Sequence, residues 1–511
     1  MGIGRGWDEA AIRNEGRHRD DLASGRTRFT SWPLEAHLQM STFCDVSCVM
    51  CWDGANPPTT DASEATLAGV GRLVDRGLRL LVPHDGSEPL ARGWSRTHEF
   101  ARGQAIALEV TTNAQTLTTS KLEAALDVLD HLVVSLDSHI PALLEQIRPG
   151  LDARRTFANV AAAVHRCRRA AIPVTANVVL LAMNLETVHD TVRWLAELGI
   201  DAVTVIRLKS VNGRSDHLDP ERVHGAAAVA LAAKRARAVA EEVGVDLAWC
   251  LDDEPLGRPS TSPPTHLRGR LHQLDQRLSL DHPGYCRFAR SSLRVRADGS
   301  TAPCGYAAQG ELDLGNLALD DPDDVWNGPS AQDLRRSMLT RDLPRLCTTC
   351  IHAQDPLPLA DHPILDDLPA GASAAFGRVV APRGVIRSDA APSVALEGVA
   401  ASVRDVALLV EGPNQADAVE LAVPTRGPHR LRIDVPEWLW GSLPPYTARW
   451  FTAVGTGPDG RRERVVHGAW ALVRAPHLPR ISGSALRYDD DRPVAREVHL
   501  GAEIPVRARR R

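Results

Sequence analysis

Three cysteines near the start of the chain have a spacing that could hold a metal cluster. Cys44, Cys48 and Cys51 form a C-x3-C-x2-C triplet directly after an apolar, strand-like stretch. Three thiolates on one loop can ligate three irons of a cubane iron–sulfur cluster, for which four cysteines would be the full complement. The fourth iron would keep an open coordination position, as reacting metal sites do and structural sites do not. The triplet therefore predicts a reactive 4Fe-4S cluster.

Zinc is the main alternative at this loop and at a second group of cysteines further along the chain. Structural zinc sites usually combine two Cys-x2-Cys pairs or add histidines, and no histidine lies within the triplet loop. The second group ends in a Cys-x2-Cys pair, so a four-cysteine zinc site stays open there. Its members are Cys286, Cys304, Cys347 and Cys350.

The triplet resembles the signature of the radical S-adenosylmethionine enzymes. In that family the open iron chelates the amino and carboxylate groups of S-adenosyl-L-methionine (SAM), and an electron from the cluster cleaves SAM to a 5′-deoxyadenosyl radical. Asp45 stands where asparagine is frequent in the signature, and Met50 where an aromatic residue is frequent. Neither departure removes a ligand, so the resemblance implies a three-cysteine 4Fe-4S cluster with bound SAM.

The resemblance continues at later strand ends. Residues 86–89 read Gly-Ser-Glu-Pro and look like the Gly-Gly-Glu-Pro turn that receives the amino group of SAM. A glycine turn suits this role because backbone carbonyls can approach a cation closely. Residues 111–113 and 135–137 resemble the polar strand ends that line the ribose and methionine portions. The resemblance thus implies SAM-binding roles for Gly86, Ser87, Glu88, Pro89, Asn113, Ser135, Asp137, Arg148 and Asn177.

The second cysteine group looks like the twitch form of the SPASM extension, which carries one auxiliary 4Fe-4S cluster. The similar features are a glycine between the first two cysteines, a Gly-Asn-Leu turn at 315–317 and the closing Cys-x2-Cys pair. No cysteine follows Cys350, so a second auxiliary cluster is not expected. Four thiolates could saturate the cluster, which suits electron transfer rather than substrate ligation.

Strand-like and helical segments alternate between residues 34 and 250 and predict the elements that position these groups. Such alternation favours βα units around a parallel sheet, and right-handed crossovers would curl it into a partial (β/α)6 TIM-like barrel. Active residues of this α/β fold lie at the carboxyl ends of the strands. The cysteine triplet follows the first predicted strand, which agrees with that rule.

The remaining chain divides by composition. We expect an N-terminal extension over 1–33, the barrel over 34–255, a small α+β twitch domain over 280–355 and a C-terminal tail over 481–511. Residues 370–480 alternate aliphatic runs with Gly, Pro and Asp turns, which indicates an all-β, sandwich-like domain. Trp438, Trp440 and Trp450 could form a sugar-stacking platform there, although such tryptophans more often lie in a β core.

Two further residues stand near predicted strand ends. Arg207 follows the sixth strand and is a candidate catalytic residue that could bind a substrate anion or help to remove a hydroxyl proton. A surface arginine is an equally good interpretation. Cys250 ends the next strand and could donate a hydrogen atom, but a lone cysteine is usually a small buried hydrophobe.

Composition limits the partners. The 511 residues are 43% hydrophobic and 24% charged, with a net charge of −5. That balance gives no reason to expect nucleic acid or an anionic membrane as a partner. No apolar run has the length of a membrane span, and the chain begins with charged residues, so we expect a cytoplasmic protein. Clustered cysteines in a reducing compartment bind metal more often than they form disulfides.

The resemblance implies an oxidoreductase-like enzyme with an external reductant, such as flavodoxin or ferredoxin, and a small-molecule or peptide substrate. Oxidation of a sugar or aminocyclitol alcohol is the favoured reaction, because one auxiliary cluster held by four cysteines resembles the aminocyclitol dehydrogenases. Peptide or protein maturation by the same radical chemistry is the alternative. A non-catalytic metal-binding scaffold with a carbohydrate- or protein-binding β-domain is an alternative of another class.

Overall fold

The fold is known from a computed structural model of the chain. It describes residues 8–51, 58–208, 215–250, 266–282, 284–307, 310–348, 350, 353, 385–388, 390–391, 393–397, 403–411, 419–422, 430–457, 459–464, 470–475, 483–489 and 492–498.

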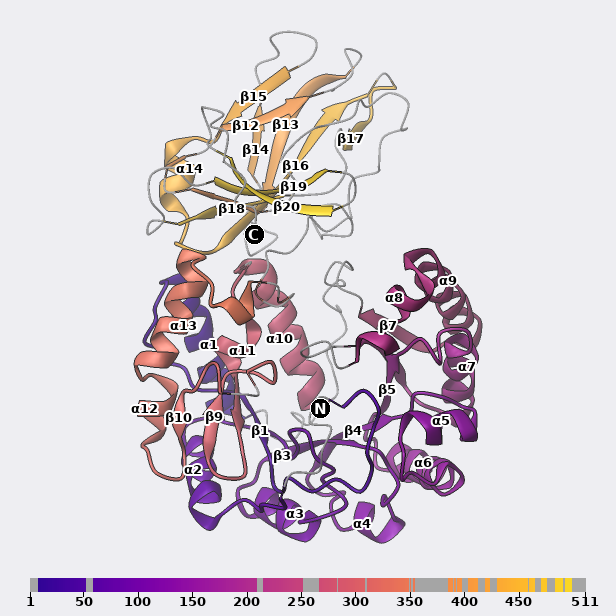
Figure 1. Cartoon of the computed structure of the whole chain (residues 1–511). Coiled ribbons are helices and arrows are strands. Elements are labelled where there is room, and N and C mark those ends of the chain that lie inside the picture. The colour runs from indigo at the N-terminus through magenta and orange to yellow at the C-terminus, as the bar shows by residue number, and fades with distance from the viewer. Residues whose placement is uncertain are drawn as a thin grey trace.

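A ten-stranded sheet forms the centre of the molecule (Figure 1). Its strand order is β10-β9-β8-β1-β2-β3-β4-β5-β6-β7, and every neighbouring pair from β1 to β7 is parallel. Within the described residues β10 and β7 are the sheet's two edges, so the barrel stays open. The predicted α/β partial barrel is confirmed. Strands β1–β7 span Glu35–Leu38, Leu80–Val82, Ala107–Thr112, Leu129–Ser135, Val174–Leu180, Ala202–Arg207 and Asp246–Cys250.

Helices cover the outer side of this curved sheet (Figure 1). Their ends follow local signals: the Ser63 side chain caps α2, the Asp152 side chain caps α6, and Gly199 ends α7 in the left-handed conformation. The helices are α2 (Glu64–Val74), α3 (Trp94–Gly103), α4 (Thr119–Glu123), α5 (Pro141–Ile147), α6 (Ala153–Arg169), α7 (Val188–Leu198), η1 (Asp216–Leu218), α8 (Pro220–His224) and α9 (Ala226–Val243).

The strands carry an alternating burial pattern that separates the outer layer from the inner side. In β5 the residues 174, 176, 178 and 180 are buried, whereas 175, 177 and 179 are half-buried. Because side chains alternate across a strand, the first set packs under the helices and the second faces the barrel interior. Thr175 follows this rule, since its hydroxyl lies 3.0 Å from the ring of His131 in the interior.

Helix α10 (Leu267–Asp281) was not predicted. Its amide groups at Leu267 and Arg268 donate to the carboxylate of Asp130, which lies near the start of β4. Arg268 then reaches Glu35 of β1 and Glu109 of β3. The polar inner face of this helix hides its amphipathic pattern, although the buried leucines recur at 267, 271, 274 and 278, which is a helical spacing.

The segment with the second cysteine group extends the same sheet rather than standing apart from it. Strand β8 is parallel to β1, and β9 and β10 follow as antiparallel strands. The elements are α11 (Arg287–Ser291), β8 (Ser292–Val295), β9 (Ser300–Ala302), β10 (Gly315–Asn316), α12 (Pro322–Trp326), α13 (Pro329–Thr340) and η2 (Arg345–Cys347).

The N-terminal segment packs on this extension through α1 (Glu9–Ala23) and the residues that follow it. Phe29 and Asn327 exchange two hydrogen bonds, from the Phe29 amide at 2.9 Å and from the Asn327 side chain at 3.0 Å. The guanidinium of Arg335 lies 3.9 Å from the ring centre of Phe29 and 4.4 Å from that of Trp326. These contacts join the segment that follows α1 to the cysteine-bearing extension.

The C-terminal part is all-β with one short helix, as predicted. A six-stranded sheet has the order β11-β18-β16-β13-β14, with β17 beside β16, and β12 and β15 form a separate pair. The elements are β11 (Val385–Ser388), β12 (Ser393–Glu397), β13 (Arg404–Glu411), β14 (Val419–Ala422), β15 (Arg430–Asp434), α14 (Glu437–Ser442), β16 (Ala448–Thr456), β17 (Arg462–Arg464) and β18 (Trp470–Arg474).

Two expectations about this part differ from the structure. The segment expected to be a tail contains an antiparallel pair, β19 (Gly483–Asp489) and β20 (Arg492–Val498). Trp440 and Trp450 are buried, and only Trp438 of the three tryptophans is exposed, so they do not form a stacking platform. The domain touches the core where the Tyr446 carbonyl lies 2.9 Å from Nδ1 of His282. Among the described helices, none combines the length and apolarity that a membrane span needs.

Candidate metal and cosubstrate site

The cysteine triplet lies on the loop after β1, at the carboxyl end of the strand as predicted. Backbone hydrogen bonds fix this loop against the segment after α5: the amide of Ser47 donates to Pro149 at 2.8 Å and that of Val49 to Ile147 at 3.0 Å. Cys44, Cys48 and Cys51 are free and half-buried. The loop therefore has a defined path that does not depend on its thiols.

Burial disfavours the thiolate form of two of the triplet cysteines, Cys44 and Cys48. Burial raises the pKa of Cys44 to about 12, against the opposing hydrogen bond from the backbone of Val46. Burial also raises the pKa of Cys48, and the charge of Arg148 acts in the opposite direction. A coordinating thiol is deprotonated by the metal, so a raised pKa of the free thiol does not prevent ligation. Three cysteines on one loop fit a cluster with one open iron.

Arg148 and Asp137 form a buried ion pair beside Cys48. The guanidinium donates to the Asp137 carboxylate at 2.7 Å and to the sulfur of Cys48 at 3.5 Å. The second carboxylate oxygen accepts from the amide of Val179 at 2.9 Å. Burial lowers the pKa of Arg148, but the neighbouring Asp137 carboxylate raises the pKa of this guanidinium above its ordinary value. The sequence did not point to Asn184, which is fully buried and donates to the carbonyl of Asp137 at 2.9 Å.

Glu88 ties the predicted SAM turn to the end of β3. Its carboxylate accepts from the hydroxyl of Thr112 at 2.6 Å, the amide of Asn113 at 2.7 Å and the amide of Leu90 at 3.1 Å. Burial raises its pKa to about 7. Gly86 supplies the left-handed conformation of the turn, with φ of 71°. Glu88 therefore acts on a ligand through the position of the turn, because its oxygens already have partners.

The departure at Asp45 has a structural reason. Its carboxylate accepts from the side chain of Asn113 at 2.7 Å and from that of Gln115 at 3.3 Å. These contacts hold the cysteine loop to the end of β3. Gln115 was not predicted, and its position three residues after the end of β3 is the only signal in the sequence.

The other predicted SAM-binding residues occupy neighbouring strands. Ser135 of β4 pairs in register with Asn177 of β5, and both are half-buried on the inner side. Arg207 ends β6, where its guanidinium lies 3.3 Å from Glu221 of α8. Its catalytic role stays a prediction. The side chain of Cys250 is outside the described residues.

We expect Asp137→Ala and Glu88→Ala to weaken SAM binding without preventing cluster assembly, since neither residue is a predicted ligand. Each change removes hydrogen bonds that position the segments around the site, and such a loss costs about 1–3 kcal/mol, which is roughly a tenfold to hundredfold loss of affinity. Equilibrium binding of SAM to the iron-loaded variants measures this. Asp127→Ala is the control, because Asp127 pairs with Arg102 at the surface. Unchanged affinity in both variants would move the pocket elsewhere.

The second cysteine group converges at the junction of the extension with the barrel. Cys286 precedes α11, Cys304 follows β9, and Cys347 ends η2. Burial raises the pKa of Cys286 and Cys347 to about 12 and about 11, and the charges of Cys304 and Cys350 add to the effect in both. Backbone hydrogen bonds from residues 288 and 289 reach Cys286. Such donors to sulfur are typical of iron–sulfur ligands.

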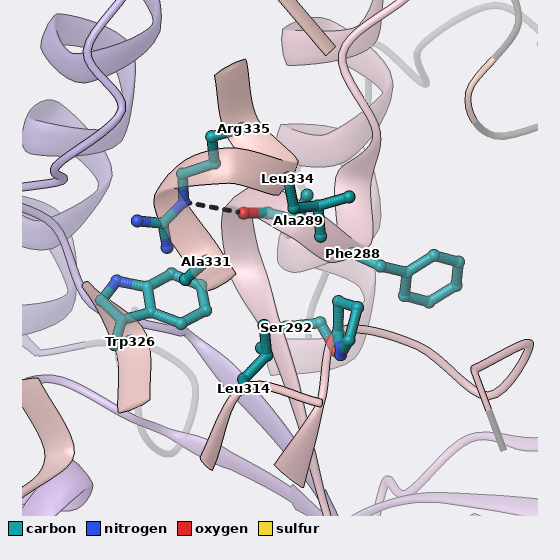
Figure 2. Close-up of a pocket in the computed structure, with 9 residues that line it drawn as sticks. Phe288, Ala289, Ser292, Leu314, Trp326, Ala331, Leu334 and Arg335 are labelled. Carbon is teal, nitrogen blue, oxygen red and sulfur yellow. Dashed lines mark hydrogen bonds between the residues drawn. The ribbon is translucent and has the colours of Figure 1, made fainter. Parts of the chain in front are cut away.

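A small, mostly apolar cavity is lined by residues that follow Cys286 and by Pro303, which precedes Cys304 (Figure 2). Figure 2 shows Trp326, Ala331 and Leu334 facing Ala289 and Ser292 across it, and Arg335 donates to the carbonyl of Ala289 at 3.2 Å. The hydroxyl of Ser292 is buried without a partner. The residues two and three positions after Cys286 thus belong to the wall of this cavity. Within the described residues, no three His, Cys, Asp or Glu side chains are arranged as ligands of a single metal ion.

A network of charged side chains crosses the inner side of the sheet below the site, and the sequence did not predict it. Nδ1 of His131 lies 2.9 Å from Glu109, and Nε of Arg268 lies 2.9 Å from the same carboxylate. Arg268 also donates to Glu35, and Arg287 lies 3.5 Å from Glu35. Burial raises the pKa of Glu109, but Arg268 and His131 lower it further, to about 2.

We expect this network to make the barrel less stable in acid. Because Glu109 has a lowered pKa in the fold, its contribution is complete above about pH 4.5 and is lost as the pH falls towards 2. The contribution is on the order of 3 kcal/mol. In chemical denaturation of the cluster-free protein, the free energy of unfolding of Glu109→Gln should be well below that of the parent at pH 7. The difference between the two proteins should be smaller at pH 3. Glu242→Gln, which removes an exposed partner of Arg193, is the control. A gap that does not change with pH would contradict the assignment.

Comparison with known proteins gives one family match and several similar structures. Residues 286–351 match the family model of the SPASM iron–sulfur cluster-binding domain, which confirms the predicted iron–sulfur segment. No curated protein sequence matches the chain. Streptococcus suis SuiB bound to S-adenosylmethionine is 18% identical, with a TM-score of 0.47 over 66% of this chain and 75% of that one.

Two further structures are similar at the same level or below. Native anSMEcpe with bound AdoMet is 16% identical, with a TM-score of 0.46 over 63% of this chain and 88% of that one. BtrN in complex with AdoMet and 2-DOIA is 11% identical, with a TM-score of 0.30 over 60% of this chain and 87% of that one. At these scores the likeness carries no assignment of function by itself.

Proposed function

We propose that this chain, whose residues 286–351 match a SPASM iron–sulfur cluster-binding domain, is a radical S-adenosylmethionine enzyme. The observation that carries the proposal is the position of the cysteine triplet. It lies at the carboxyl end of β1, on a loop that Asp45 ties to Asn113 and that Arg148 ties to Asp137. The turn at 86–89 joins the same loop, since the Glu88 amide donates to Phe43 at 3.1 Å.

A three-cysteine cluster at this loop would supply the electron that cleaves SAM to methionine and a 5′-deoxyadenosyl radical able to abstract hydrogen from a substrate. The chain's own residues would hold the cosubstrate. The turn at 86–89 offers backbone carbonyls to its amino group, and Ser135 and Asn177 offer polar side chains on the inner side of neighbouring strands. The Arg148 side chain brings a positive charge next to Cys48, where a carboxylate would bind.

We further propose that the net reaction is the two-electron oxidation of an alcohol carbon. The four cysteines of the extension can saturate an auxiliary 4Fe-4S cluster, which would then accept an electron rather than bind substrate. The half-buried inner face of β5 and β6 carries Asn177 and Thr204, whose amide and hydroxyl groups suit a hydroxylated substrate. Peptide maturation is the second candidate on the same radical chemistry.

Anaerobic iron and sulfide analysis tests the first part of the proposal. Protein reconstituted with iron and sulfide should hold about eight irons, as two cubane clusters require. With SAM and dithionite it should release 5′-deoxyadenosine and methionine, which chromatography measures. Absence of iron, or zinc in its place, would instead favour the non-catalytic scaffold.

A further inference from the structure

An ion pair joins the predicted SAM turn to the extension that carries the second cysteine group. Asp85 directly precedes Gly86 of the turn, and Arg294 lies in β8. Nη1 of Arg294 is 2.5 Å from Oδ1 of Asp85. The two side chains are 17% and 12% exposed, so solvent screens this pair less than a surface pair.

The same Arg294 guanidinium touches the loop of Cys304. A Cβ atom placed on Gly305 would lie 2.5 Å from Nη1, 2.7 Å from Cζ and 3.0 Å from Nη2 of Arg294. The guanidinium therefore packs against the backbone of the residue after Cys304, in space that the glycine leaves open. One side chain thus touches both the segment before the SAM turn and the segment beside an auxiliary cysteine.

The surrounding backbone holds this pair in place. The Gln39 side chain donates to the Asp85 carbonyl at 2.6 Å and accepts from the Ala297 amide at 3.3 Å. Strands β1 and β8 are paired in register, with His37 opposite Arg294. The ends of β1, β2 and β8 are therefore fixed to one another around the ion pair.

Arg294 and Asp85 are not the only ionisable groups in this region, since Arg296 donates to the carbonyl of Ala307 in the loop after Cys304. His84 after β2 and His37 of β1 face the pair, and burial lowers the pKa of His84 to about 3 and also lowers that of His37, so both rings are neutral at pH 7. Glu35 and Glu109 face His37 and His84, respectively, and both are paired with Arg268. Removal of either Arg294 or Asp85 therefore changes the charge beside Cys304 with a defined sign.

We infer that Arg294 is a positioning residue that connects the SAM turn to the auxiliary cluster and raises the reduction potential of that cluster by its charge. This inference rests on the proposed function. A reduced cluster carries one more negative charge than an oxidised one, so a nearby cation favours the reduced state and a nearby carboxylate disfavours it. Arg294 and Asp85 should both favour SAM binding, because both hold the turn. Arg294 should raise the reduction potential of the cluster, and Asp85 should lower it.

Two matched variants separate these effects in the full chain. Arg294→Gln and Asp85→Asn should each weaken SAM binding, by about tenfold, because either change releases the turn. Potentiometric titration followed by electron paramagnetic resonance should show a lower potential for Arg294→Gln and a higher one for Asp85→Asn. For the potential, both changes are made in a variant whose triplet cysteines are alanines, so that the auxiliary cluster alone gives the signal.

Two further variants complete the test. Arg294→Lys should keep a potential close to the parent value, since the charge is retained, while SAM binding weakens because the ion pair loses its geometry. Arg102→Gln removes one positive charge at the surface, where Arg102 pairs with Asp127, and should change neither quantity. A shift of potential in the same direction for Arg294→Gln and Asp85→Asn, or in Arg294→Lys as large as in Arg294→Gln, overturns the inference. A parent protein that holds no auxiliary cluster or does not cleave SAM would instead overturn the proposed function.

Discussion

Replacement of Cys44, Cys48 and Cys51 together by alanine is expected to abolish the reductive cleavage of SAM. These thiols are the predicted ligands of the reactive cluster, and no cluster with an open iron can form on the loop without them. The barrel should stay folded, because the loop is fixed by the backbone hydrogen bonds from Ser47 to Pro149 and from Val49 to Ile147. Release of 5′-deoxyadenosine in the presence of dithionite measures the loss, and circular dichroism measures the fold.

The chain offers a matched control for this experiment. Cys167 is fully buried on α6, away from both cysteine groups in the sequence. Cys167→Ala removes a thiol of the core and should leave the iron content and the cleavage rate close to the parent values. Cleavage at the parent rate in the triple variant would show that SAM is not bound at this loop, and the proposed function would be lost.

Replacement of all four auxiliary cysteines by serine is expected to separate SAM cleavage from substrate oxidation. The variant should hold about four irons instead of about eight and should still cleave SAM slowly, since the triplet lies on a different loop. It should not complete a two-electron oxidation, because the electron of the substrate radical would have no acceptor. Iron analysis, 5′-deoxyadenosine release and product formation measure the three outcomes.

We expect the extension to survive this change because packing supports it independently of the metal. Trp326 and Arg335 are almost completely buried, and β8 is paired with β1 over four residues. Metal binding and folding are coupled in many small cysteine-rich units, so circular dichroism must accompany the assay. A folded variant that oxidises substrate at the parent rate would show that these cysteines are structural, and the dehydrogenase proposal would be withdrawn.

The parts of the fold that the sequence predicts are those with local patterns. The alternation of strands and helices from β1 to β7 is visible in the sequence, because buried parallel strands are continuous apolar runs. The cysteine triplet is visible for a similar reason, since its three ligands lie within eight residues. The strand–helix alternation and the cysteine triplet both depend on spacing along the chain and not on contacts between residues that are distant in sequence.

The parts that the sequence did not predict depend on distant partners. Helix α10 turns charged residues inward, where Arg268 meets Glu35 and Glu109, so its polar composition resembles that of a surface segment. Asp85 and Arg294 are 209 positions apart and have no common pattern. The environment of Asp45 is also tertiary, because its carboxylate is used by Asn113 and Gln115 of another strand end.

The pairing of β1 with β8 has a consequence for how the protein is made. One edge of β1 pairs with β2, but the other must wait for β8, which is synthesised roughly 250 residues later. At about 5–20 residues per second, that delay on the ribosome is on the order of ten to fifty seconds. During this delay the nascent barrel has an unpaired strand edge that can pair with other chains. The cysteine loop beside that edge is open to oxidation for the same time. Only when the extension has left the ribosome can the sheet around that loop be completed.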